Sequence, residues 1–251
     1  MTRTSGRVGR WLRLLLTAVV TAATLVVVAA QPAQAGHDKN PGALGPGGQP
    51  YGQSYGEWGA AWWQWAGSFP SGKDPITEGD GQVVYGGAQN QPRGPVWFLA
   101  GNFGGPVHRA LTVPRGKALF LPLVNFVFWA PEDCEFLQLA HCRATDLKHK
   151  LREIQGQTVD LVMTVDGKRF VGLDDYTGLS KPFPLTIKEG DLFNGFGYPP
   201  GVRDPAISGG HWMMLAPLSK GTHTLQWGGR SAAPEFAGSL PQDVTYTITV
   251  N

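Results

Sequence analysis

Short apolar or alternating runs, broken by Gly, Pro, Asn or Asp, dominate the chain from residue 82 onward. They include PVWFLAG, ALFLPLVNFVFW, DLVMTVDGKRF, HWMMLAPL, HTLQWGG and DVTYTITV. Runs of this length and spacing predict the strands of a sandwich or barrel. In the last run apolar side chains occupy every second position from 244 to 250, which predicts a strand with one buried face. The Asp166-Gly167 pair between two runs predicts a tight hairpin.

Two stretches have the spacing of helices: residues 54–65, SYGEWGAAWWQW, and residues 144–155, ATDLKHKLREIQ. On the first, one helical face carries Tyr55, Trp58, Trp62 and Trp65, as expected for a helix that packs on a sheet. Trp63 lies at the edge of this stripe and is the candidate for an exposed ring. A sugar-binding aromatic platform is the alternative. We therefore predict a mainly β, single-domain β-sandwich, jelly-roll-like, with one N-terminal aromatic helix and one short internal helix.

The first 35 residues have the pattern of a secretory signal peptide. Four arginines precede the apolar run LLLTAVVTAATLVVVAA, and an AQA tripeptide predicts cleavage after Ala35. An uncleaved anchor helix is the alternative, because the run approaches the length of a membrane span. Residues 36–50, rich in Gly and Pro, predict a flexible leader, and residues 51–251 the sandwich domain. The expected location is secreted or extracytoplasmic, with no membrane contact after cleavage.

Charge argues against nucleic acid as a partner. The formal net charge is +2, from 21 basic and 19 acidic residues. The predicted signal peptide carries four of the basic residues and no acidic one, so its removal leaves 17 against 19, a charge of −2. A basic footprint for nucleic acid is therefore not expected.

The chain has two cysteines, Cys134 and Cys142, in EDCEFLQLAHC. Export favours their oxidation, so we predict a disulfide that closes a short loop. The neighbouring His141 and the two thiols match no standard zinc spacing. No metal or cofactor is predicted, and a cupin-like site built from distant histidines is the alternative. Asn102 and Asn125 end strand-like runs and are expected to satisfy turn backbone.

Glu57 has two interpretations. Ser54-x-x-Glu57 matches the capping box of a helix N-terminus, in which the two side chains satisfy each other's backbone donors. The alternative is an acid–base role in a cleft. Because the positive end of the helix dipole lowers the pKa of a carboxyl, a base or ligand would suit Glu57 better than a general acid. We favour capping.

Residues 189–212, EGDLFNGFGYPPGVRDPAISGGHW, predict the most unusual long loop of the domain, and long loops in β-domains often carry function. The loop supplies candidate catalytic residues Asp191, Asp204 and His211, besides Glu57. Candidate ligand-binding residues are Trp63 and, from this loop, Tyr198, Arg203 and Trp212. The alternative is that Gly and Pro make turns here and that Arg203 pairs with a nearby carboxylate.

Five motifs resemble, in the same order, those of a family of exported bacterial proteins with no established activity. They are YGQSYGEWGAAWWQW, GPVWFLAGNFGG, LTVPRGKALFLPLVN, HWMMLAPLSKGTHTLQWGG and DVTYTITV. The resemblance covers nearly all of the predicted mature chain and implies no substrate or catalytic residue. Members of that family often carry cysteines near the positions of Gly87 and Ala110, both of which lack cysteine here.

The sequence contains no nucleophile elbow, zinc-protease helix, phosphate-binding loop or dinucleotide fingerprint. Export, surface loops and nine tryptophans favour a protein that binds an extracellular polysaccharide or another cell-envelope polymer. A hydrolase or lyase acting on such a polymer, with two of the four candidate catalytic residues as acid and base, is the second hypothesis. A structural or interaction module without a small ligand is the third. No feature of the sequence indicates an oligomeric state.

Overall fold

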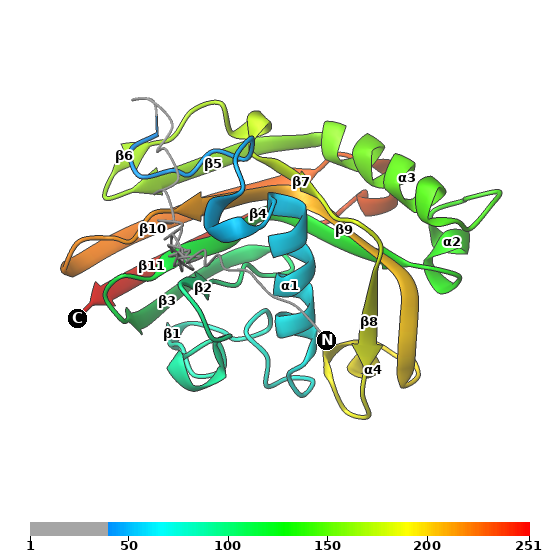
Figure 1. Cartoon of the computed structure of the whole chain (residues 1–251), viewed down its shortest axis with the longest axis horizontal. Helices are drawn as coiled ribbons and strands as arrows, with labels where there is room; N and C mark the ends of the chain where they lie inside the picture. The colour runs from blue at the N-terminus through cyan, green and yellow to red at the C-terminus, as the bar shows by residue number, and fades with distance from the viewer. Residues whose placement is uncertain (1–39) are drawn as a thin grey trace, which may run out of the picture. The chain divides into compact units, whose positions relative to one another are not determined.

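Two β-sheets pack face to face in a computed structural model that describes residues 40–251 (Figure 1). The predicted signal peptide lies outside the described residues. The six-stranded sheet has the order β1 (Gly81–Gln82), β3 (Gly105–Val113), β11 (Gln242–Val250), β10 (Gly221–Ser231), β5 (Thr158–Val165) and β6 (Lys168–Arg169). The five-stranded sheet has the order β2 (Val96–Phe98), β4 (Ala118–Trp129), β9 (Gly201–Leu215) and β7 (Thr177–Leu179), with β8 (Phe183–Ile187) also paired to β9.

Four α-helices accompany the sheets within the described residues: α1 (Tyr55–Gly67), α2 (Glu132–Phe136), α3 (Ala144–Gly156) and α4 (Leu192–Gly195). Single 3-10 turns lie at Pro50–Gly52, Ala88–Asn90, Leu173–Asp175 and Pro234–Phe236. Helix α1 covers the outer face of the five-stranded sheet, and α2 and α3 lie together at one end of it (Figure 1). The fold thus has three layers, one helical and two β.

The predicted single-domain β-sandwich is confirmed, as are both predicted helices. Asp166 and Gly167 form the turn of the β5–β6 hairpin with φ of 51° and 75°, the left-handed conformation that this sequence pair favours. The apolar residues of β11 are buried at every second position, as predicted. The strand pairing differs from an all-antiparallel jelly roll, because β11 runs parallel to β3 over nine residue pairs.

A β-bulge in β4 determines which residues face α1. Before it, Ala118 and Phe120 pack toward α1, while the alternate leucines pack between the sheets. The register against β9 shifts between Pro122 and Val124. An extra residue reverses the alternation of a strand, so Val127 and Trp129 now pack on the helix side. The phenylalanines of the NFVF segment thereby face the end of the molecule that α2 and α3 cover.

The tryptophan stripe of α1 forms the helical core layer. Trp58, Trp62 and Trp65 are buried, and Trp62 lies 5.8 Å, ring to ring, from Trp212 on β9. The indole nitrogens of all three stripe tryptophans donate to backbone carbonyls, which satisfies their polar atoms inside the core. Core packing, and not an exposed platform, therefore explains this stripe. Trp63, expected to be exposed, is only 7% exposed.

Residues 40–50 differ from the predicted flexible leader. Asn40 is buried, donates to the carbonyl of Val171 and accepts from its N–H. The amide of Leu44 donates to the carbonyl of Met214 at the end of β9. The segment is held because its backbone pairs with a strand edge and because Ala43 and Leu44 are buried in the core, contacts with distant residues that composition does not reveal.

Residues 189–212 also differ from the predicted long loop. They contain α4 and the first twelve residues of β9, so irregular backbone is confined to short connections. The sequence predicted a loop because β9 contains Pro205, Gly209 and Gly210, residue types that are common in loops. Gly210 is required in the strand, because a Cβ there would lie 2.5 Å from the carbonyl oxygen of Val124 on β4.

The predicted disulfide between Cys134 and Cys142 is present, and no free cysteine remains in the described chain. It ties α2 to the segment before α3. Such a bond fits an oxidising compartment. Within residues 40–251 no helix is both long and apolar enough to cross a membrane.

Candidate functional site

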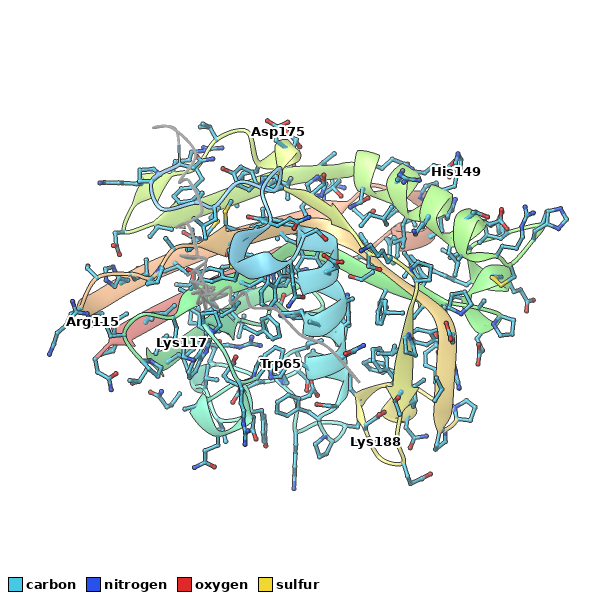
Figure 2. All side chains as sticks on the ribbon, viewed as in Figure 1. Trp65, Arg115, Lys117, His149, Asp175 and Lys188 are labelled. Atoms are coloured by element: carbon cyan, nitrogen blue, oxygen red, sulfur yellow. A yellow bond between two sulfur atoms is a disulfide. The ribbon has the colours of Figure 1, made fainter. Side chains whose placement is uncertain are left out.

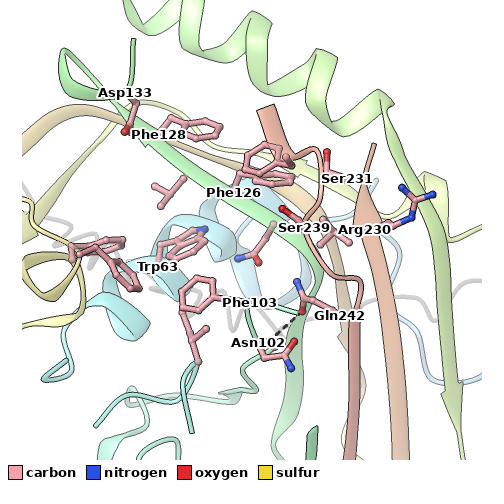
Figure 3. Close-up of a pocket in the computed structure, with 18 of the residues that line it drawn as sticks. Trp63, Asn102, Phe103, Phe126, Phe128, Asp133, Arg230, Ser231, Ser239 and Gln242 are labelled. Carbon is pink, nitrogen blue, oxygen red and sulfur yellow. Dashed lines mark hydrogen bonds between the residues drawn. The ribbon is translucent and has the colours of Figure 1, made fainter. Parts of the chain in front are cut away.

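A cleft of about 410 Å³ opens at the end of the sandwich near α2, and aromatic side chains dominate its walls (Figure 3). We call it the aromatic cleft. Its volume falls within the range of small-molecule sites. It is lined by seven phenylalanines, three tryptophans and one tyrosine: Phe103, Phe126, Phe128, Phe136, Phe193, Phe196, Phe236, Trp62, Trp63, Trp129 and Tyr198.

The cleft lies along an unpaired edge of β4. Strand β2 pairs only with residues 118–120, so residues 124–129 have β9 on one side and no strand of the described chain on the other. All six of these residues line the cleft. Side chains from both faces of the strand, Phe126 and Phe128 on one and Trp129 on the other, therefore reach the same hollow. The bulge in β4 sets which of them face which side.

Four exposed apolar side chains form the rim of the cleft: Phe103, Phe136, Phe196 and Leu240. They are 57%, 49%, 54% and 67% exposed. Phe103 and Phe196, which come from separate loops, meet edge to face with ring centroids 5.5 Å apart. The rim holds four of the nine large apolar side chains exposed in the described chain. Such gathering at one hollow is typical of a binding site and not of scattered surface residues.

Asp133 supplies a carboxyl to the cleft wall. It is 5% exposed and accepts hydrogen bonds from the Trp129 amide (2.8 Å) and the Tyr198 hydroxyl (3.1 Å). Burial raises the pKa of Asp133 to about 6, against the lowering effect of these two donors. Burial likewise raises the pKa of Tyr198 to about 12, so the phenol stays protonated and donates. In Figure 3 Asp133 lies at the opposite end of the cleft from Asn102 and Gln242.

Three buried donors of residues that line the cleft lack partners among the described residues: the indole nitrogens of Trp63 and Trp129 and the amide nitrogen of Asn125. In Figure 3 the indole of Trp63 lies among the other side chains that line the cleft. A buried donor without an acceptor is costly, so water or a ligand oxygen is expected to satisfy such groups. Asn125 was expected to bond the backbone of a turn, and its amide nitrogen does not. Asn102 does so, because its side chain bonds the backbone of Gly104 and Gly105.

A buried cation holds one wall of the cleft in place. Arg109 is 2% exposed and donates to the carbonyls of Ile76, Ala100 and Gly101 at 3.1–3.2 Å. Its guanidinium also lies over the Tyr246 ring, 5.8 Å from the centroid. Ile76 and Gly101 line the cleft, so Arg109 positions two wall segments against the six-stranded sheet.

The structure places Glu57 in the predicted capping box. The Glu57 carboxylate accepts from the Ser54 amide at 2.9 Å, and the Ser54 hydroxyl accepts from the Glu57 amide at 3.3 Å. Lys181 forms an ion pair with Glu57 at 2.9 Å. The bond from Lys181, followed by those from Ser54, lowers the pKa of Glu57 to about 2. Glu57 is absent from the aromatic cleft.

The other three candidate catalytic residues lie apart. Asp191 is the buried N-cap of α4 and accepts from the Lys188 and Asn194 amides. Asp204 is exposed on β9. His211 is buried in β9 beside Val124 and Thr177, and burial lowers its pKa. No hydrogen bond or ion pair of the described chain joins any two of the four candidates, and none of them lines the cleft.

The candidate ligand-binding residues divide into two groups. Trp63 and Tyr198 line the cleft. Trp212 is fully buried in the core and stacks on Phe120 at 5.1 Å. Arg203 is buried with its Nε 2.7 Å from a Glu132 carboxylate oxygen, the carboxylate pairing that the sequence offered as its alternative role. Arg203 thereby supports the start of α2 and does not enter the cleft.

None of the four rim residues was predicted from the sequence. Phe103 in NFGG and Phe196 in GFGY are single phenylalanines next to glycine in turn-forming segments. An aromatic residue in such a place has no strand or helix face to bury it, and this was the available signal. Of the other phenylalanines of the cleft, Phe126 and Phe128 lie in a strand and Phe136 and Phe193 in helices, where a buried apolar residue is ordinary and gives no such signal.

One further cluster has the residue types of a serine-hydrolase triad. His223 lies 2.7 Å from Asp166 through Nδ1 and 3.3 Å from the Ser219 hydroxyl through Nε2. Nε2 is also 2.9 Å from the Ser219 carbonyl, an acceptor, so it carries a proton and cannot act as the base for the hydroxyl. None of the three residues lines the aromatic cleft. These contacts therefore hold the β5–β6 turn against the turn that precedes β10.

Charged groups and metal ligands are dispersed. The labelled charged side chains, among them Arg115, His149 and Lys188, lie around the periphery in Figure 2. Within residues 40–251 no three His, Cys, Asp or Glu side chains are placed to hold a metal ion. Comparisons with models of protein families, with curated proteins and with solved structures give no match to this chain. The aromatic cleft is therefore the main candidate site among the described residues.

Proposed function

We propose that this protein is an exported binding protein that holds a small, largely apolar ligand in the aromatic cleft. The supporting observation is the rim, where four exposed apolar side chains surround a hollow already walled by buried aromatic rings. Exposing such rings to water is unfavourable, and a ligand that covers them recovers about 25 cal/mol per Å² of apolar area. The unpartnered donors of Trp63 and Asn125 give the ligand a point of polar attachment.

The composition of the cleft favours an apolar ligand over a sugar. Its aromatic walls are mainly phenylalanine, and its fourteen apolar lining residues outnumber its eight polar ones. A sugar brings several hydroxyl groups, each of which needs a partner when it leaves water. An envelope component would therefore enter this cleft through its apolar part.

Titration with the neutral dye Nile red, followed by dye emission and by tryptophan emission, tests this function. The test variant is Phe103→Ser combined with Phe196→Ser. Loss of two apolar contacts of about 1 kcal/mol each corresponds to roughly 30-fold weaker binding. The matched control is Val84→Ser combined with Val202→Ser, which removes exposed apolar side chains outside the cleft. Saturable binding that both pairs of substitutions leave unchanged would contradict the proposal.

A second candidate is glycan binding at another hollow. A groove of about 450 Å³ between α1 and the segment before β2 is lined by amide side chains and by Trp58 and Trp65, each 8% exposed, with Arg93 at its side. Amide and guanidinium side chains can bond the hydroxyl groups of a saccharide, and this favours the polymer predicted from the sequence. Pull-down with polysaccharides, comparing wild type with Arg93→Ala and with Arg115→Ala as a control outside the groove, tests it. Equal retention of all three proteins would argue against this groove.

A further inference from the structure

The acidic end of the aromatic cleft has an uncompensated charge. Three ionisable side chains line the cleft: Asp133, Tyr198 and Arg230. Arg230 is paired with Asp160 at 2.9 Å. The Asp133 carboxylate has no cationic side chain of the described chain within ion-pair distance, although it is 95% buried. A buried carboxylate without a cation is unfavourable, so a cation that reaches it is stabilised.

Aromatic rings surround this carboxylate. The rings of Trp129 and Tyr198 meet edge to face with centroids 4.7 Å apart, and both residues donate hydrogen bonds to Asp133. Phe136, one turn further along α2, contributes a half-exposed ring to the same end of the cleft. The faces of aromatic rings carry negative potential and attract ammonium groups. A fixed carboxylate beside several rings is therefore complementary to an organic cation.

The charges that face Asp133 do not change this conclusion. Glu132, beside it on α2, raises its pKa, whereas Arg203 and the Tyr198 hydroxyl lower it. Arg203 is already paired with Glu132, so its charge is largely compensated. Burial is the dominant influence on Asp133, and at neutral pH the carboxyl is mostly ionised.

We propose that the aromatic cleft selects a cationic amphiphile, whose ammonium group lies beside Asp133 and whose apolar part lies against the rim. This inference rests on the proposed function of the cleft and specifies its ligand class. An anionic head group would meet the like charge of Asp133, and within residues 40–251 the one cationic side chain that lines the cleft, Arg230, is already paired. A neutral head group is tolerated and can at most hydrogen-bond to the carboxylate, without the attraction between opposite charges.

Calorimetric titration with three ligands of equal chain length tests the selection: decyltrimethylammonium and decanoate, each below its micellar concentration, and decan-1-ol below its solubility limit. We expect the ammonium ligand to bind about tenfold or more tightly than the alcohol, and decanoate to bind weakest. Lowering the pH from about 8 to about 5 should weaken binding of the ammonium ligand and change that of the alcohol much less, because protonation removes the charge of Asp133.

Two substitutions on α2 complete the test. Asp133→Asn should abolish the preference for the ammonium ligand, whereas Glu135→Gln, the same charge change on an exposed residue of the same helix, should keep it. If Asp133→Asn fails to fold, the pH series on the wild-type protein decides. Equal, pH-independent binding of ammonium and alcohol, or tightest binding of decanoate, would overturn the inference and leave the proposed function standing. Failure of all three ligands to bind would instead contradict the proposed function.

Discussion

Replacing Trp62 tests whether α1 is a core layer or an exposed platform. Its ring is 1% exposed, packs against Trp63, Trp65 and Trp212, and donates to the carbonyl of Leu99 at 2.9 Å. Truncation of a buried tryptophan costs about 3–5 kcal/mol. The carbonyl left without its donor adds about 1 kcal/mol. We therefore expect Trp62→Ala to lower the free energy of unfolding by about 4–6 kcal/mol, or Tm by roughly 10–20 °C for a domain of this size.

Two control variants separate packing from hydrogen bonding. Trp62→Phe keeps a ring in the core and loses the hydrogen bond and some volume, so we expect a cost of about 1–2 kcal/mol. Gln64→Ala changes an exposed residue of the same helix and should stay within about 0.5 kcal/mol of wild type. Urea unfolding followed by circular dichroism measures all three. A Trp62→Ala protein as stable as Gln64→Ala would refute the assignment of α1 to the core.

Three other outcomes follow from the contacts. Replacing Cys134 and Cys142 by serine should lower the free energy of unfolding by about 2–3 kcal/mol, measured by urea unfolding; unchanged stability would show that the bond does not restrain α2. Ser54→Ala should cost about 1 kcal/mol and Glu57→Gln less, since glutamine also serves in a capping box, and the reverse order in melting would contradict capping. The hydrogen bond to Asp166, in the β5–β6 turn, raises the pKa of His223 in the folded protein. The contact therefore stabilises the fold fully below pH 6.5, and this stabilisation is lost as the pH rises through the folded-state pKa of His223. The Tm difference between wild type and His223→Gln should therefore shrink with rising pH, and a difference that grows would contradict it.

Local patterns predicted those parts of the fold that local physics determines. The alternation in β11, the Asp166-Gly167 turn and the capping box of α1 each follow from residues within one or two turns of chain. The pairing of Cys134 with Cys142 follows from their short separation. These features need no knowledge of distant contacts.

Features that depend on distant contacts were not predictable. Residues 40–50 are ordered by the edge of β9, and the loop-like composition of β9 reflects close approach of β4 at Gly210. The cleft arises where β2 ends early beside β4, a consequence of strand order. Its rim is assembled from loops far apart in sequence, so Phe103 and Phe196 meet only in the fold.

A crystal structure of the protein with decan-1-ol at saturating concentration would show whether the aromatic cleft holds an apolar ligand. We expect the alkyl chain in the cleft, in contact at about 4 Å with the rings of Phe103, Phe196 and Trp63. An empty cleft in those crystals, or the alcohol bound only in the groove beside Trp65, would contradict it.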